Sequence, residues 1–115
     1  ELDSINNYDP SEFIETYKTQ GLEVLDVRKQ SEFESQHLEG AENFPLDFIY
    51  KSLGQLNKDK AYTVHCAGGY RSVAAASIMK KYGIKEVTNV LGGFNAMKII
   101  EGAPVSAFQE QATML

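Results

Sequence analysis

The 115-residue chain has the size and composition of a single globular domain, with 43% hydrophobic and 23% charged residues. Its 11 basic and 16 acidic residues are scattered and give a net charge of −5, which argues against nucleic acid as the main partner because phosphate backbones need a basic face. The longest apolar stretches are too short to cross a bilayer and no signal-peptide pattern is present, so no membrane partner is expected.

The chain contains a single cysteine, Cys66. One cysteine cannot form an internal disulfide, so nothing indicates an oxidising compartment and a cytoplasmic location is expected. The first residue is Glu1 rather than Met, which is typical of a segment of a longer polypeptide.

The first half of the chain carries short helix and strand patterns. Residues 1–9 are polar and are predicted to be an extended lead-in to a domain that spans 10–105. A helix should begin at Pro10, because Asp9 can cap it and proline fits its first position, and it should end at Gly21. The other expected elements are a strand from Leu22 to Val27, a brief helix from Ser31 with a capping box to Glu34, a strand from Gly40 to Phe44 stopped by Pro45, and a short helix capped by Asp47.

The second half alternates strand and helix patterns more clearly. The segment from Ser72 to Tyr82 has the i, i+3, i+4, i+7 apolar spacing of a helix. Short strands that alternate with helices predict an α/β fold, with a mostly parallel sheet and helices on both faces. The other expected elements are strands Ala61–His65 and Val87–Leu91, a turn at Gly92-Gly93, a final helix Phe94–Ile100 and a polar tail at 106–115.

A glycine-containing loop, Cys66-Ala67-Gly68-Gly69-Tyr70-Arg71-Ser72, follows the predicted strand that ends at His65. Ligands of open α/β sheets bind beyond the carboxyl ends of the strands, where this loop begins. Gly68 and Gly69 allow the backbone to curl so that successive N–H groups converge on one point. Arg71 adds a cation, and Ser72 is placed to cap the following helix. Together these features favour a thiolate over a thiol.

The alternative is that Cys66 is a buried apolar residue, because free cysteines are among the most buried residues. The two glycines, the arginine five positions later and the immediate start of a helix favour an activated thiol instead. We therefore predict Cys66 as a catalytic nucleophile, with Ala67 to Ser72 as its substrate-binding loop.

Three blocks of the sequence occur in a characteristic order and spacing. They are Leu25-Asp26-Val27-Arg28 with Glu32-Phe33 and the run from His37 to Pro45, then the loop from Cys66 to Ser72, then Val90 to Phe94 with Gly102-Ala103-Pro104-Val105. In this order they resemble the rhodanese-like domain family, and the resemblance covers nearly the whole chain. It implies a sheet of about five mostly parallel strands flanked by helices.

The resemblance also implies an activity, sulfur transfer without a cofactor. The Cys66 thiolate would take the outer sulfur of a small anionic donor such as thiosulfate, or of a related persulfide donor. An external acceptor, cyanide or a thiol, would then remove the sulfur from the Cys66 persulfide, because the chain has no second cysteine. The loop is further similar to that of rhodanese modules fused to metallo-β-lactamase-fold hydrolases, so an attached domain is a further expectation.

Loop length separates this chemistry from that of related cysteine phosphatases. Four residues lie between Cys66 and Arg71. The corresponding loops of the related phosphatases have five residues between cysteine and arginine and form a wider cradle for a phosphoryl group. His65, directly before Cys66, matches one position of the phosphatase signature. The first block, however, offers no evident general acid for a phosphatase. Sulfur transfer is preferred, and the alternatives are a non-enzymatic binding or regulatory module and a cysteine phosphatase.

Three residues of the first block are expected to support the site rather than to react. Asp26 and Arg28, at the end of a strand, should satisfy loop amides or pair with Glu32. His37 lies in a segment that positions a turn, so a structural role is preferred to that of a base.

Two other residues near the cysteine have open roles. His65 should not contact the Cys66 thiol, because neighbouring residues of a strand point to opposite faces. Tyr70 either shapes the access of the acceptor or is a surface residue without a role. Two histidines and one cysteine so placed do not form a metal site.

Overall fold

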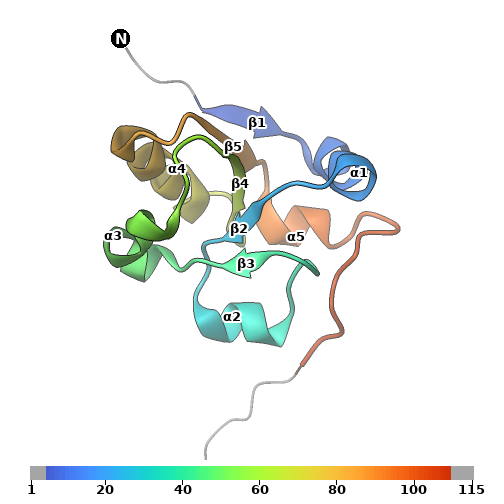
Figure 1. Cartoon of the computed structure of the whole chain (residues 1–115). Helices are drawn as coiled ribbons and strands as arrows, with labels where there is room; N and C mark the ends of the chain where they lie inside the picture. The colour runs from blue at the N-terminus through green and yellow to red at the C-terminus, as the bar shows by residue number, and fades with distance from the viewer. Residues whose placement is uncertain (1–4, 110–115) are drawn as a thin grey trace, which may run out of the picture.

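A parallel β-sheet of five strands forms the centre of the protein in a computed structural model that describes residues 5–109 (Figure 1). The strand order is β1-β5-β4-β2-β3, and every neighbouring pair is parallel. The predicted α/β fold with about five strands is therefore confirmed. The strands are β1 (Asn6–Tyr8), β2 (Val24–Asp26), β3 (Glu42–Asn43), β4 (Ala61–His65) and β5 (Glu86–Val90).

Helices cover both faces of this sheet (Figure 1). Helices α1 and α5 pack against each other on one face, whereas α4 packs on β4 and β5 from the other. The α-helices are α1 (Pro10–Gln20), α2 (Gln30–Ser35), α3 (Ile49–Ser52), α4 (Arg71–Tyr82) and α5 (Gly93–Met97), and two short 3₁₀ helices, η1 (Leu46–Phe48) and η2 (Leu53–Gln55), flank α3.

Each face of the sheet has its own apolar cluster. On the α4 face, Met79 packs with the strand residues Leu25 and Val64. On the α1 face, Phe13 packs with Val90 and the residues of α5. Because apolar layers cover both faces, the central strands are buried on both sides and need no alternation of polar and apolar residues.

The segment expected to be a lead-in contributes a strand. Residues Asn6–Tyr8 form β1, which pairs with β5 in the register Asn6 to Thr88 and Tyr8 to Val90. These residues carry no apolar alternation, because they lie at an edge of the sheet where one side faces solvent. The sequence pattern therefore did not predict this strand, which is defined by its backbone hydrogen bonds to β5.

Two helix starts differ from the predicted ones. Helix α2 begins at Gln30, one residue before Ser31, and the Glu32 carboxylate accepts a hydrogen bond from the backbone N–H of Lys29 at 3.0 Å. The expected capping box from Ser31 was therefore wrong by two positions. Asp47 does not cap a helix either, since it lies inside η1, which follows Pro45.

Candidate active site

The loop after β4 lies at the carboxyl edge of the sheet, as its sequence position predicted. Strand β4 is central, between β5 and β2, and ends at His65. The chain then turns through residues 66–70 into α4, which begins at Arg71. The loop is therefore held between a buried strand and the first turn of a 12-residue helix, whose first backbone N–H groups have no partner within the helix and can donate to an anion.

The sulfur of Cys66 lies at the base of this loop. Cys66 is only 1% exposed, and its Sγ accepts a hydrogen bond from the backbone N–H of Gly69 at 3.1 Å. Gly69 has a φ of +108°, a conformation that side chains other than hydrogen rarely adopt. This glycine conformation turns the N–H inward, so the fold directs backbone donors at the sulfur.

Ser72 also contacts the sulfur rather than capping α4. The helix begins one residue earlier, at Arg71, so the predicted capping role of Ser72 is wrong. Its hydroxyl is fully buried and lies 3.5 Å from Cys66 Sγ. A hydroxyl can rotate to donate a hydrogen bond to a thiolate or accept one from a thiol.

These contacts lower the pKa of the Cys66 thiol. Burial by itself raises the pKa, because it disfavours the charged thiolate. Hydrogen bonds from the Ser72 hydroxyl and from the backbone N–H groups of Ser72, Gly69 and Arg71 outweigh burial, so the pKa lies below its usual value. A thiolate is the nucleophilic form of cysteine, and the hydrogen bonds of the loop favour this form.

Arg71, the first residue of α4, binds a carboxylate of α2. Its guanidinium donates to Glu32 at both ends, with Nη1 2.7 Å from Oε1 and Nη2 3.1 Å from Oε2. The hydrogen bond from Arg71 holds the pKa of Glu32 below its usual range. Both side chains are 35% exposed, so the pair lies at the surface. No pattern in the sequence indicated Glu32 as the partner of Arg71.

A second charged group lies beside the loop and is nearly closed to solvent. Asp26 is fully buried and accepts three hydrogen bonds from the Arg28 side chain, at 2.8 to 3.1 Å, and one from its backbone N–H. Arg28 also donates to the backbone carbonyl of Gln36. The expected pairing with Glu32 is absent among these contacts, and the two residues pair with each other instead.

The two histidines contact backbone groups rather than the thiol. The ring of His37 stacks on Phe33 at 3.9 Å, and its Nδ1 lies 2.8 Å from the backbone carbonyl oxygen of Phe33. His65 is fully buried, with Nδ1 3.1 Å from the carbonyl oxygen of Cys66. Burial lowers the pKa of His65, which favours the neutral ring despite the nearby Asp26 carboxylate.

The turn at Gly92-Gly93 brings backbone donors to the loop that begins at Cys66, a role that the sequence pattern did not predict. The backbone N–H of Phe94 donates to the Cys66 carbonyl at 2.7 Å, and that of Asn95 donates to the Ala67 carbonyl at 3.0 Å. Gly93 has a φ of +60°, and a Cβ there would overlap the Cys66 carbonyl oxygen. Only glycine therefore allows α5 to approach the loop this closely.

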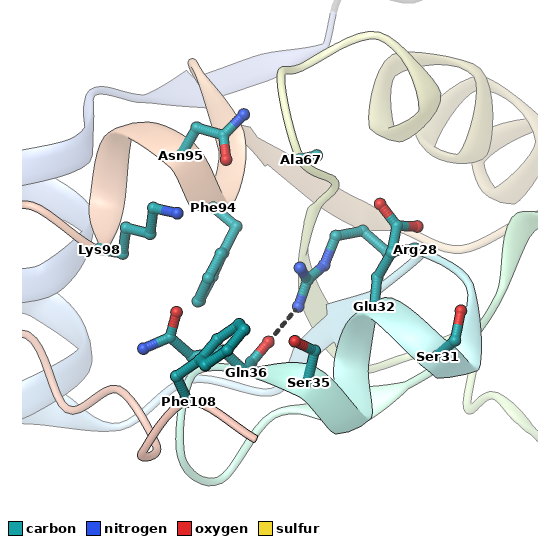
Figure 2. A pocket seen from close by; sticks show the side chains of 10 residues that line it. All are labelled: Arg28, Ser31, Glu32, Ser35, Gln36, Ala67, Phe94, Asn95, Lys98 and Phe108. Atoms are coloured by element: carbon teal, nitrogen blue, oxygen red, sulfur yellow. Dashed lines mark hydrogen bonds between the residues drawn. The ribbon is translucent and has the colours of Figure 1, made fainter. Parts of the chain in front are cut away.

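A pocket of about 470 Å³ lies next to the loop (Figure 2). Ala67, the residue after Cys66, forms part of its wall, as do the ion-paired Glu32 and the buried Arg28. Phe94 and Phe108 supply apolar surface. Tyr70 does not line this pocket and is 89% exposed. The pocket places a ligand-sized space beside the reactive loop, and the sequence patterns did not indicate it.

Two further properties of residues 5–109 bear on the class of protein. No helix in this range is long and apolar enough to span a membrane. No group of three or more histidine, cysteine, aspartate or glutamate side chains in the same range is arranged to hold a metal ion.

The five-stranded parallel sheet and the loop that begins at Cys66 define a class of fold, and known proteins share it. The family model "Rhodanese-like domain" matches residues 9–99. The chain belongs to the rhodanese-like domain family. A solved rhodanese-related protein from Thermoplasma volcanium is 30% identical, with a TM-score of 0.78, over 88% of this chain and 97% of that one.

Two curated relatives carry names that refer to sulfur chemistry. "Putative sulfur carrier protein YrkF" of Bacillus subtilis is 39% identical over 64% of this chain. "Thiosulfate sulfurtransferase GlpE" of Coxiella burnetii is 29% identical over 73% of this chain and 78% of its own length. The chain spans only 40% of YrkF and 57% of YqhL, a further Bacillus subtilis relative. The similarity therefore supports membership of a sulfurtransferase family.

Proposed function

We propose that the protein is a sulfurtransferase that carries a sulfane sulfur on Cys66. The observation that carries this proposal is the pair of contacts at Cys66 Sγ, which accepts a hydrogen bond from the Gly69 N–H at 3.1 Å and lies 3.5 Å from the Ser72 hydroxyl, its hydrogen-bond partner. These donors lower the pKa of the thiol, and they are placed to stabilise negative charge on an added sulfur in the same loop.

The first half-reaction loads the cysteine. The Cys66 thiolate attacks the outer sulfur of thiosulfate, a new S–S bond forms, and the bond inside the donor breaks. Sulfite leaves with the electron pair of that bond.

The second half-reaction removes the outer sulfur from the Cys66 persulfide. An external thiolate attacks the outer sulfur of the Cys66 persulfide and becomes a persulfide itself, while Cys66 leaves as the thiolate. The acceptor is external because Cys66 is the only cysteine of the chain. The loop donors that stabilise the thiolate also make it a good leaving group, since a low pKa of the leaving thiol speeds exchange.

Intact-mass spectrometry after treatment with thiosulfate tests the proposal. We expect one sulfur to be added, a gain of roughly 32 Da that dithiothreitol removes, together with release of sulfite. The Cys66→Ala variant should gain nothing. Absence of an adduct on the wild-type protein would contradict the proposal and favour a binding module. Hydrolysis of an aryl phosphate that depends on Cys66 would identify a phosphatase instead.

A further inference from the structure

His65 is a fully buried polar side chain that takes no part in the two half-reactions. It is the last residue of β4, directly before Cys66. Its Nδ1 lies 3.1 Å from the Cys66 carbonyl oxygen, whereas its Nε2 is buried and has no hydrogen-bond partner within residues 5–109. A buried polar atom without a partner costs free energy, which an apolar side chain at this position would avoid. A role beyond packing is therefore expected for this histidine.

The surroundings of the His65 ring determine which of its nitrogens carries the proton. Burial lowers the pKa of His65, and the Arg28 charge acts in the same direction. The Asp26 carboxylate, 3.7 Å from Nε2, and the Cys66 carbonyl raise that pKa by less, so the ring is neutral and holds one proton. A carbonyl oxygen can only accept a hydrogen bond, so the proton lies on Nδ1, which donates to the Cys66 carbonyl.

The Cys66 carbonyl accepts a second hydrogen bond, from the backbone N–H of Phe94 in α5 at 2.7 Å. The ring of Phe94 stacks on that of His65, with the ring centres 6.2 Å apart and the planes 22° apart. Figure 2 shows the Arg28 guanidinium beside the same Phe94 ring, and its Cζ lies 4.4 Å from the ring centre. These contacts fix both the imidazole and the carbonyl group that it binds.

Hydrogen bonds to this carbonyl act on the sulfur of the same residue. The carbonyl oxygen carries a negative partial charge, which disfavours a thiolate nearby, and two donors offset part of that charge. The peptide bond between Cys66 and Ala67 is trans, so its N–H points away from the C=O and from the His65 ring. The histidine therefore sets the orientation of the first peptide unit of the loop.

We propose that His65 is a positioning residue of the site, whose Nδ1–H holds the Cys66–Ala67 peptide unit and thereby favours the thiolate of Cys66. It acts through the Cys66 carbonyl, since no hydrogen bond joins its ring to Sγ within the described residues. The inference deepens the sulfurtransferase function proposed above and rests on it only for the rate of loading.

Two amide side chains test which ring nitrogen matters. Asparagine carries its NH₂ close to the position of Nδ1 and glutamine close to that of Nε2, so His65→Asn should retain the contact and His65→Gln should lose it. The ultraviolet absorbance of the thiolate against pH, with Cys66→Ala as the blank, gives the midpoint of ionisation without any sulfur donor. We expect the midpoint of His65→Gln to lie about 0.5–1 pH unit above that of the wild type, the contribution of one hydrogen bond, and His65→Asn to restore it.

A matched variant separates this role from a general weakening of β4. Val64→Ala opens a cavity in the core at the neighbouring residue and should leave the midpoint unchanged. An unmoved midpoint in His65→Gln, equal shifts in the Asn and Gln variants, or an equal shift in Val64→Ala would overturn the positioning role. If the His65 variants do not fold, ¹⁵N NMR of the wild-type ring decides. We expect the proton on Nδ1, and its absence there would overturn the role.

The rate of loading by thiosulfate connects the inference to the proposed function. Below both midpoints, His65→Gln should load about two- to fourfold more slowly than the wild type, because the smaller thiolate fraction is partly offset by a more nucleophilic thiolate. Failure of the wild type to gain sulfur would overturn the proposed function, and the thiolate titration would still decide the role of His65.

Discussion

Two charged groups meet at the carboxyl edge of the sheet, and they differ in how far the protein itself satisfies them. The Asp26–Arg28 pair is at least 95% buried, and the carboxylate accepts all its hydrogen bonds from Arg28. The Cys66 loop instead directs donors at a sulfur that we propose gains a second sulfur, and its Arg71–Glu32 pair is one-third exposed. The buried Asp26–Arg28 pair therefore stabilises the fold, whereas the charged groups of the Cys66 loop can exchange one partner for another.

The largest effect is expected on the buried pair. Asp26→Asn should lower the free energy of unfolding by about 3–5 kcal/mol, because it leaves the Arg28 charge buried without its partner. Glu23→Gln, which breaks an exposed pair with Lys60 at 3.7 Å, should cost less than about 1 kcal/mol. Urea unfolding at an unchanged m-value measures both. Equal costs would show that the Asp26–Arg28 pair is not structural.

A smaller effect is expected at the turn that supports the loop. Gly93→Ala should cost about 1–3 kcal/mol for its left-handed backbone alone, and more if the loop carbonyls cannot move away. It should also slow the loading of Cys66, since the same turn fixes the Cys66 carbonyl. Gly54→Ala, with open space around its Cβ position, is the matched control and should be neutral or slightly stabilising. An unchanged rate of Cys66 loading in Gly93→Ala would show that the turn does not support the site.

The exposed ion pair should affect donor use rather than folding. Arg71→Ala should change the free energy of unfolding by less than about 1 kcal/mol, because the pair is partly solvated. It should raise the KM for thiosulfate. Glu32→Gln should lower that KM, since it frees the Arg71 guanidinium for the anionic donor. Steady-state kinetics at two ionic strengths checks both, and a stable Glu32→Gln variant with a higher KM would contradict this role.

The smallest effect is a shift in pH dependence. The pKa of Cys66 is lowered, so the rate of loading should rise with pH and reach its plateau below the pH at which an ordinary thiol ionises. Ser72→Ala removes a hydrogen bond that favours the thiolate, and the midpoint should move to higher pH. A loading rate measured from pH 5 to 9 tests this. An unmoved midpoint would mean that the backbone donors alone activate the sulfur.

Local patterns predicted much of the fold and part of the site. The strand Ala61–His65 and the helix from the Ser72 region to Tyr82 were visible because their propensity and spacing agree with their burial. Short elements were less visible, since β1 is an edge strand of three polar and aromatic residues that is defined by its pairing with β5. The starts of α2 and α4 lie one residue before the predicted ones, because the Glu32 carboxylate caps α2 at Lys29 and Ser72 contacts Cys66 Sγ instead of capping α4.

The sequence by itself determined the α/β fold and the position of Cys66 at the mouth of a glycine loop, because strand ends, glycines and a helix start are local properties of the chain. Only the tertiary structure decided which side chains meet there. The partner of Arg71 is 39 residues away, the turn that supports the loop follows another strand, and the pocket combines Arg28, Phe94 and Phe108. Contacts between segments so far apart depend on how the helices pack around the sheet, which no local pattern specifies.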